Sequence, residues 1–150
     1  MIVVVVADDD VDVCVEGVDA LCVDEGTHAT APSTDRQPVM LSFQRLDVYQ
    51  RATEFLALAT EIIEQMPRGN AGCADQLLRS AESVIRNIAE GSGRWSKADS
   101  AKHYKIARGE AMECAASLDV LKIRNLVAGN KYEEGIKLLE RVVKMLTKMV

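Results

Sequence analysis

The feature that most restricts the fold of this chain is an apolar repeat, with alternating steps of four and three residues, that begins near residue 47. Its first run contains Val48, Ala52, Phe55, Ala59, Ile62 and Met66. This spacing keeps the side chains on one face of an α-helix, whereas a half-buried strand would alternate at every second residue. The run is followed by Pro67, which cannot continue a helix interior. Residues 47–66 are therefore predicted to form one amphipathic helix.

Three further segments carry the same repeat. The second is predicted to be helical from about residue 74 to residue 90. Its apolar stripe contains Leu77, Ala81, Val84, Ile88 and, in part, Ile85. The third is expected to begin after Ser96, whose spacing to Asp99 is typical of a capped helix start. Its stripe contains Tyr104, Ala107, Ala111, Cys114, Leu118 and Leu121. The stripe of the fourth contains Tyr132, Ile136, Leu139, Val143, Leu146 and Val150.

Short breaks separate these four segments. Gly91 and Gly93 are expected to end the second helix with positive backbone φ angles, and Gly129 with Asn130 to end the third. Four amphipathic helices joined by short loops bury their stripes most economically against one another. The sequence therefore predicts an all-α protein that forms an antiparallel up-down four-helix bundle over residues 40–150.

Residues 1–39 differ in composition from the rest of the chain. They contain nine acidic residues and one basic residue, a net charge of −8, whereas residues 40–150 contain 17 basic and 14 acidic residues, a net charge of +3. The leader is rich in Val and ends in a linker with Thr, Ser and Pro, and this composition predicts weak order. An over-extended gene start, with Met40 as the true start, and an authentic acidic tail are both open interpretations.

Composition also excludes several classes of function. The four cysteines stand singly, without the paired spacing or the nearby His of a zinc site, so no metal and no cofactor is predicted. No apolar run approaches the ~18 residues that a membrane span requires. Residues 1–7 lack the basic start of a secretory signal. We expect a cytoplasmic protein without membrane association.

One segment carries a more specific pattern, Arg79-Ser-Ala-Glu-Ser-Val-Ile-Arg-Asn-Ile-Ala-Glu-Gly-Ser-Gly-Arg94. It resembles the signature of the ribosomal S23-like family, small four-helix-bundle proteins encoded in intervening sequences of bacterial large-subunit ribosomal RNA genes. The accessory proteins of diversity-generating retroelements are relatives. Leu46-Asp-Val-Tyr-Gln-Arg-Ala52 and Ile106-Ala-Arg-Gly-Glu-Ala111 are similar to the first-helix and third-helix segments of this family. The resemblance covers about residues 41–150.

The resemblance implies the bundle fold, a ring-shaped homopentamer and, in the retroelement relatives, a reverse transcriptase as partner, but no settled biochemical activity. The residues themselves also favour self-association, because two helices carry a second apolar row beside the first. On the fourth helix this row contains Leu138, Val142, Met145 and Met149. On the third it contains Val120, Ile123 and Val127. One stripe suffices to bury a helix in a bundle, so a second row predicts a contact between copies. The alternative is deep burial inside one bundle.

Asn87, Glu90 and Gly91 are predicted to form a structural corner at the end of the second helix. Asn87 is expected to bond to neighbouring backbone, and Gly91 to close the helix without a side-chain clash. A carboxylate at this position opposes the helix dipole, so Glu90 is expected to pair with Arg86 or Arg94.

Basic residues around this corner are the remaining functional signal. The predicted nucleic-acid-binding residues are Arg79, Arg86, Arg94, Lys97, Lys105 and Arg108. Repeated around a ring, they would form a positive band for the phosphates of RNA or DNA. Interspersed acidic residues make an ordinary solvated surface an equal alternative. Trp95 is expected either to stack on a base or to cap the end of the bundle.

No set of titratable residues favours catalysis. His28 lies in the leader, His103 lies among lysines where a surface role is expected, and Ser80 and Ser83 have no His nearby in the sequence to act as base. The sequence therefore predicts a non-enzymatic, homo-oligomeric accessory protein that binds nucleic acid or a nucleic-acid-processing partner. The alternative is a structural or protein-interaction oligomer without affinity for nucleic acid.

Overall fold

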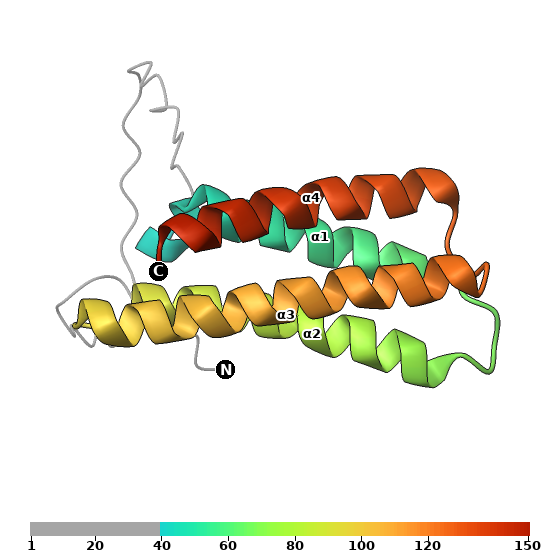
Figure 1. The fold of residues 1–150 in the computed structure, drawn as a ribbon, viewed down its shortest axis with the longest axis horizontal. Helices are drawn as coiled ribbons and strands as arrows, with labels where there is room; N and C mark the ends of the chain where they lie inside the picture. The colour runs from blue at the N-terminus through green and yellow to red at the C-terminus, as the bar shows by residue number, and fades with distance from the viewer. Residues whose placement is uncertain (1–39) are drawn as a thin grey trace, which may run out of the picture. The chain divides into compact units, whose positions relative to one another are not determined.

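The computed structural model describes residues 40–150, and the predicted leader, residues 1–39, lies outside the described part. The described chain forms a short 3-10 turn and four helices: η1 (Ser42–Arg45), α1 (Asp47–Glu64), α2 (Ala71–Ser92), α3 (Lys97–Ile123) and α4 (Gly129–Lys148). Successive helices run in opposite directions (Figure 1). α1 and α3 each pack against both α2 and α4, so that α1 and α3 lie diagonally opposite one another. The predicted antiparallel four-helix bundle is confirmed.

The core follows the predicted stripes of α1, α2 and α3. The six residues predicted for α3 are buried, as are the four principal residues predicted for α2. On α1 the whole predicted stripe is buried except Met66, which is half-buried. Leu58, which the repeat omits, is buried too, because it lies three residues after Phe55 and widens the same face. Within residues 40–150, no helix is both long enough and apolar enough to span a membrane.

The register of α4 differs from the prediction. Its buried residues are Gly135, Leu139, Val142 and Leu146. Ile136 and Val143, assigned to the core by the repeat, are only half-buried. Val142, assigned to the second row, is 0% exposed and belongs to the core of its own bundle. Two adjacent apolar rows satisfy the repeat equally, and the close approach of α3 decides between them: a Cβ added at Gly135 would lie 2.8 Å from Leu118 Cδ1.

The end of α3 also differs from the prediction. Asn125 has a φ of 55°, in the left-handed region, and the Leu126 N–H donates to Leu121 O at 2.8 Å. This is a common hydrogen-bond pattern for ending a helix. Gly129 and Asn130 are instead the first two residues of α4. The predicted glycine stop is therefore replaced by an asparagine stop several residues earlier.

Candidate nucleic-acid interface

The corner between α2 and α3 is built around a close contact of the two helices. Gly91 lies in the last turn of α2, where an added Cβ would be 2.6 Å from Cε1 of the buried Tyr104. The expectation that Gly91 and Gly93 end α2 with positive φ angles is wrong, since α2 continues to Ser92 and Gly93 has a φ of −86°. Gly91 is needed for packing, because only a residue without Cβ lets the Tyr104 ring rest against the α2 backbone.

Polar side chains form a network next to this contact. Asn87 Nδ2 donates to the backbone oxygen of Ser83 at 2.9 Å, and Asn87 Oδ1 lies 3.4 Å from His103 Nδ1. The same ring nitrogen is 3.6 Å from Glu90 Oε2. Arg94 pairs with Glu90 and donates from Nε to His103 Nε2 at 3.2 Å. Of the two cations expected to pair with Glu90, Arg94 is therefore the one in contact.

His103 joins α3 to this corner, and sequence reasoning missed that role. Only 15% of its side chain is exposed. Because Nε2 accepts from Arg94, the hydrogen of the neutral ring lies on Nδ1, which faces Asn87 and Glu90. The free lone pair of the ring is thus engaged by a guanidinium, so the ring is not placed as a general base for a substrate. The sequence contains one indication that His103 lies close to the core, because it directly precedes the core residue Tyr104.

Trp95 lies in the short turn that joins α2 to α3. Its exposed fraction is 104%, so the indole is fully in solvent, and the expectation that it caps the end of the bundle is wrong. The turn around it is ordered on both sides. The Gly93 N–H donates to Glu90 O at 3.1 Å, and the Asp99 N–H donates to Ser96 Oγ at 3.1 Å, which caps α3. The chain therefore holds a large apolar side chain outward on a fixed turn.

The predicted basic residues of α2 form a row that leads to this turn. Arg79 and Arg86 are exposed and, being seven residues apart, lie on one face about 10 Å apart along the helix. Arg86 Nη2 pairs with Glu82 at 3.0 Å. Within residues 40–150, Arg79 has no ion-pair partner. Arg94 follows at the end of the row, with 44% of its side chain exposed despite its pairing with Glu90.

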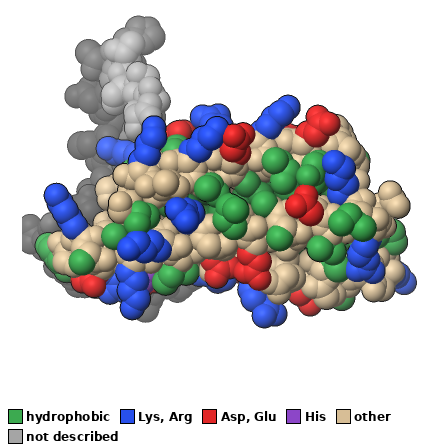
Figure 2. All heavy atoms as spheres, viewed as in Figure 1, with side chains coloured by type: hydrophobic (Ala, Val, Ile, Leu, Met, Phe, Trp, Pro, Cys, Tyr) green, Lys and Arg blue, Asp and Glu red, His purple; other side chains and the backbone are tan. Residues whose placement is uncertain are grey.

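The predicted basic residues of α3 do not join the α2 row within one chain. Lys105 and Arg108 come two and five residues after His103, which faces α2, so they project about 200° and about 140° further round the helix. Both are exposed, as is Lys97. Figure 2 shows basic side chains interspersed with acidic and apolar ones on the face that it presents. Only the row ending at Arg94 and the neighbouring Lys97 are brought together at the corner.

Exposed apolar side chains gather on the outward face of α3 rather than on α4. They are Ile106, Met112, Val120 and Ile123, with exposed fractions of 41%, 57%, 45% and 79%. Exposed Gly109 and Ala116 lie among them. Of this group, the sequence prediction included Val120 and Ile123. On α4, Leu138, Met145 and Met149 are half-buried against the core of their own bundle. The exposed apolar surface of residues 97–148 thus lies on α3 and not on α4.

The other end of the bundle is held by a second polar cluster. Arg124, which follows α3, donates from Nη1 to Cys73 Sγ at 2.8 Å and from Nη2 to Asn70 Oδ1 at 2.9 Å. A hollow of about 300 Å³, lined in part by Cys73, Gln76 and Val120, lies beside it. Within residues 40–150, no group of three His, Cys, Asp or Glu side chains is placed to hold a metal ion.

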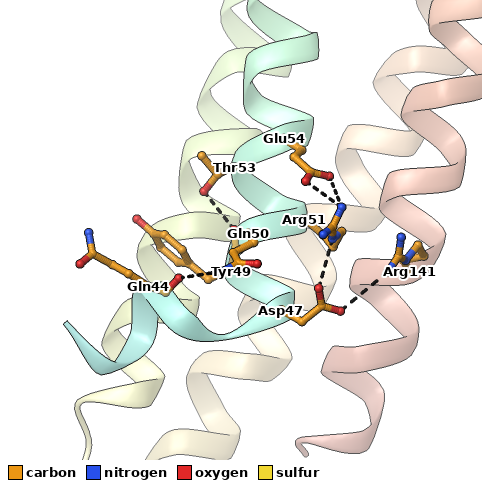
Figure 3. Close-up of polar contacts among 8 residues, drawn as sticks. All are labelled: Gln44, Asp47, Tyr49, Gln50, Arg51, Thr53, Glu54 and Arg141. Carbon is orange, nitrogen blue, oxygen red and sulfur yellow. Dashed lines mark hydrogen bonds and ion pairs between the residues drawn. The ribbon is translucent and has the colours of Figure 1, made fainter. Parts of the chain in front are cut away.

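The segment Leu46–Ala52, the second part of the family resemblance, has a structural role that can be followed in Figure 3. Arg51 donates to Asp47 Oδ1 at 3.2 Å and to Glu54 Oε2 at 2.6 Å. The hydrogen bond to Asp47 raises the pKa of the Arg51 guanidinium above its usual range. Arg141 of α4 lies 3.8 Å from Asp47 Oδ2. This network orders the first turns of α1 and joins them to α4.

Comparisons with known proteins agree with the fold and with the motifs. A solved structure of a protein with unknown function, from the S23 ribosomal protein family of Bacteroides thetaiotaomicron, is 24% identical in sequence, with a TM-score of 0.63. The match covers 68% of this chain and 96% of that chain, and it shows a shared fold. No curated protein matches. Residues 44–148 match the family described as 23S rRNA-intervening sequence protein. The chain therefore belongs to the 23S rRNA-intervening sequence protein family.

Proposed function

We propose that this protein is a non-enzymatic, homo-oligomeric accessory protein that binds nucleic acid at the α2–α3 corner. The observation that carries the proposal is the corner itself, where Arg94 and Lys97 flank the fully exposed Trp95 on an ordered turn. Arg79 and Arg86 lie in line behind it on α2. An ordered cationic row that ends in an exposed aromatic side chain has the chemistry that recognises phosphates and bases.

The charge balance of the bundle supports this location. Residues 79–108 contain seven basic and three acidic residues, a net charge of +4, whereas all of residues 40–150 carry +3. All three acids are bonded within the segment, Glu82 to Arg86, Glu90 to Arg94 and Asp99 to Ser96. The net positive charge of the bundle thus lies within the α2–α3 segment, partly on Lys105 and Arg108, which face away from α2 within one chain, and it favours polyanions near this end.

Assembly of several copies is the second part of the proposal. The exposed apolar face of α3 exceeds what a helix of a single bundle needs, and another copy of the chain would remove it from water. Lys105 lies on that face, in line with Met112 seven residues later. A contact there would bring it close to a neighbouring copy, so that the band predicted from the sequence would be completed between copies. We expect these copies to form a closed ring. The family resemblance implies that the ring is a homopentamer, and we expect it to act in the cytoplasm.

Fluorescence anisotropy with labelled single-stranded and duplex probes tests the binding. We expect binding at low salt whose affinity falls linearly on a double logarithmic plot, with a slope of about −0.7 for each phosphate contact to a single strand. Arg79→Glu combined with Arg86→Glu should weaken binding many-fold and flatten the slope.

Arg68→Glu is the matched control for Arg79→Glu alone, because each makes the same change of charge and Arg68 lies in the loop at the opposite end of the bundle. It should leave most of the affinity intact. Absence of binding by the wild-type protein at low salt would contradict the proposal. The result would then favour the alternative, a structural or protein-interaction oligomer that contacts a protein such as a reverse transcriptase rather than nucleic acid.

A further inference from the structure

We infer that Trp95 is a stacking platform for an unpaired base, so that the nucleic acid bound at the corner is single-stranded. The inference rests on the proposed function and specifies the class of partner at the same site. It begins from the exposure of the indole, which is 104%, while the next most exposed large apolar side chain of residues 40–150, Ile123, reaches 79%. A tryptophan that neither packs in the core nor caps the bundle offers both faces of its ring to a ligand.

The turn holds the backbone that carries Trp95 in a fixed place. Its preceding neighbour, Arg94, is bonded to Glu90 and to His103. Its following neighbour, Ser96, caps α3 by accepting from the Asp99 N–H. Both ends of the turn are thus tied to helices that pack against each other. Because the backbone is ordered before binding, only the rotamer of the Trp95 side chain has to be fixed when a base stacks on it, which favours affinity.

The charges around Trp95 suit a phosphate chain. Glu90 and Asp99 are the nearest acids in the sequence, and both are engaged by neighbours. Lys97 has no ion-pair partner within residues 40–150. A hollow of about 600 Å³ continues from this point between the start of α3 and the end of α4, and Lys97 and Lys148 are among the residues that line it. A strand whose base stacks on Trp95 therefore has cations on both sides for its phosphates.

The geometry favours a single strand over a duplex. In a duplex the faces of the bases are covered by their neighbours, so an indole standing on a surface turn reaches only backbone and groove edges. In a single strand each base has a free face, and stacking on an aromatic side chain is largely independent of sequence. The cations flanking Trp95 distinguish this site from an apolar pocket for a protein side chain.

The experiment uses the fact that Trp95 is the only tryptophan of the chain. Its emission in the full-length protein is recorded while a long unlabelled single strand is added, and again with a duplex of the same sequence, in which the free base faces at the two ends are few relative to its length. We expect strong quenching by the single strand and little by the duplex. Equal quenching by both, or none by a single strand that anisotropy shows to be bound, would overturn the inference.

Two substitutions separate stacking from mere proximity. Trp95→Ala should lower the affinity for the single strand about ten-fold or more, the effect typical of a lost base–aromatic stack, while Trp95→Phe should retain part of it. Because the side chain is fully exposed, both variants should keep the helicity of the wild type. If wild-type protein binds and Trp95→Ala binds equally well, the inference is wrong and the proposed function stands. If wild-type protein binds no probe, the proposed function itself fails.

Discussion

α2 and α3 pack against each other and bury similar stripes, but their outward faces are different. The outward face of α2 carries Arg79, Glu82 and Arg86, two of which form an ion pair. The outward face of α3 carries exposed apolar side chains, among them Met112 and Ile123. The inward faces account for the fold and do not distinguish the two helices. The outward faces differ, and the two proposed partners, a polyanion at the charged face of α2 and another copy of the chain at the apolar face of α3, rest on that difference.

The largest expected effect is the difference in stability between a substitution on an inward helix face and the same substitution on an outward face. Val142→Glu places a charge in the core of the bundle, and an unpaired buried charge destabilises a protein by about 3–5 kcal/mol. Ile123→Glu places the same charge on the outward face of α3, where a single chain leaves it in water. We expect denaturant unfolding to show that Val142→Glu has lost its native state. Ile123→Glu should unfold near the wild-type midpoint, even when its chains are monomeric. Equal loss in both would remove the distinction between the faces.

The next prediction concerns the different reactivity of one cysteine on α2 and one on α3. Burial raises the pKa of the Cys114 thiol on α3 to about 12, so at neutral pH almost none of it is the reactive thiolate, whereas Cys73 on α2 is partly exposed. In a protein with Cys14 and Cys22 changed to Ser, an alkylating reagent should modify Cys73 and leave Cys114 protected until the protein unfolds. Mass spectrometry at neutral pH measures this, and comparable rates at both sites would contradict the burial of Cys114.

A smaller effect is expected at two glycines of α2. Gly91→Ala forces a Cβ against the Tyr104 ring, and overpacking of this kind costs about 1–3 kcal/mol. Gly72→Ala has open space and should stabilise the helix by up to about 1 kcal/mol. Thermal or denaturant unfolding monitored by circular dichroism compares the two. A neutral Gly91→Ala would show that Gly91 is not required for the contact between α2 and α3.

The sequence predicts the inward faces well because burial imposes the helical period on them. It fails on α4, where two adjacent apolar rows satisfy that period and only the close approach of Gly135 to Leu118 distinguishes them. It also misreads Gly91, since a glycine near a predicted helix end suggests a stop, while its actual neighbour is Tyr104, thirteen residues away along the chain. Contacts between two helices do not change the spacing of apolar residues within either helix, so that spacing does not predict them.

The candidate site is predicted only in part for the same reason. Arg94 and Glu90 are four residues apart, a spacing that predicts their contact. The contacts of His103 with Asn87 and Glu90 cross the turn between helices and have no such spacing. The grouping of Lys105 with the α2 arginines overlooks the rotation of α3, which directs Lys105 away from α2. The exposure of Trp95 follows from the geometry of the turn, which composition does not specify.

The central claim is that the outward face of α3 binds another copy of the chain, while that of α2 remains free for nucleic acid. Light scattering coupled to size-exclusion chromatography, at micromolar protein concentration, tests it most directly with Ile123→Glu and Arg86→Glu, one charge change on each face. The account predicts an oligomer for the wild type and for Arg86→Glu, and monomers that keep their helicity for Ile123→Glu. A monomeric wild type, or an Ile123→Glu variant that assembles like the wild type, would contradict it.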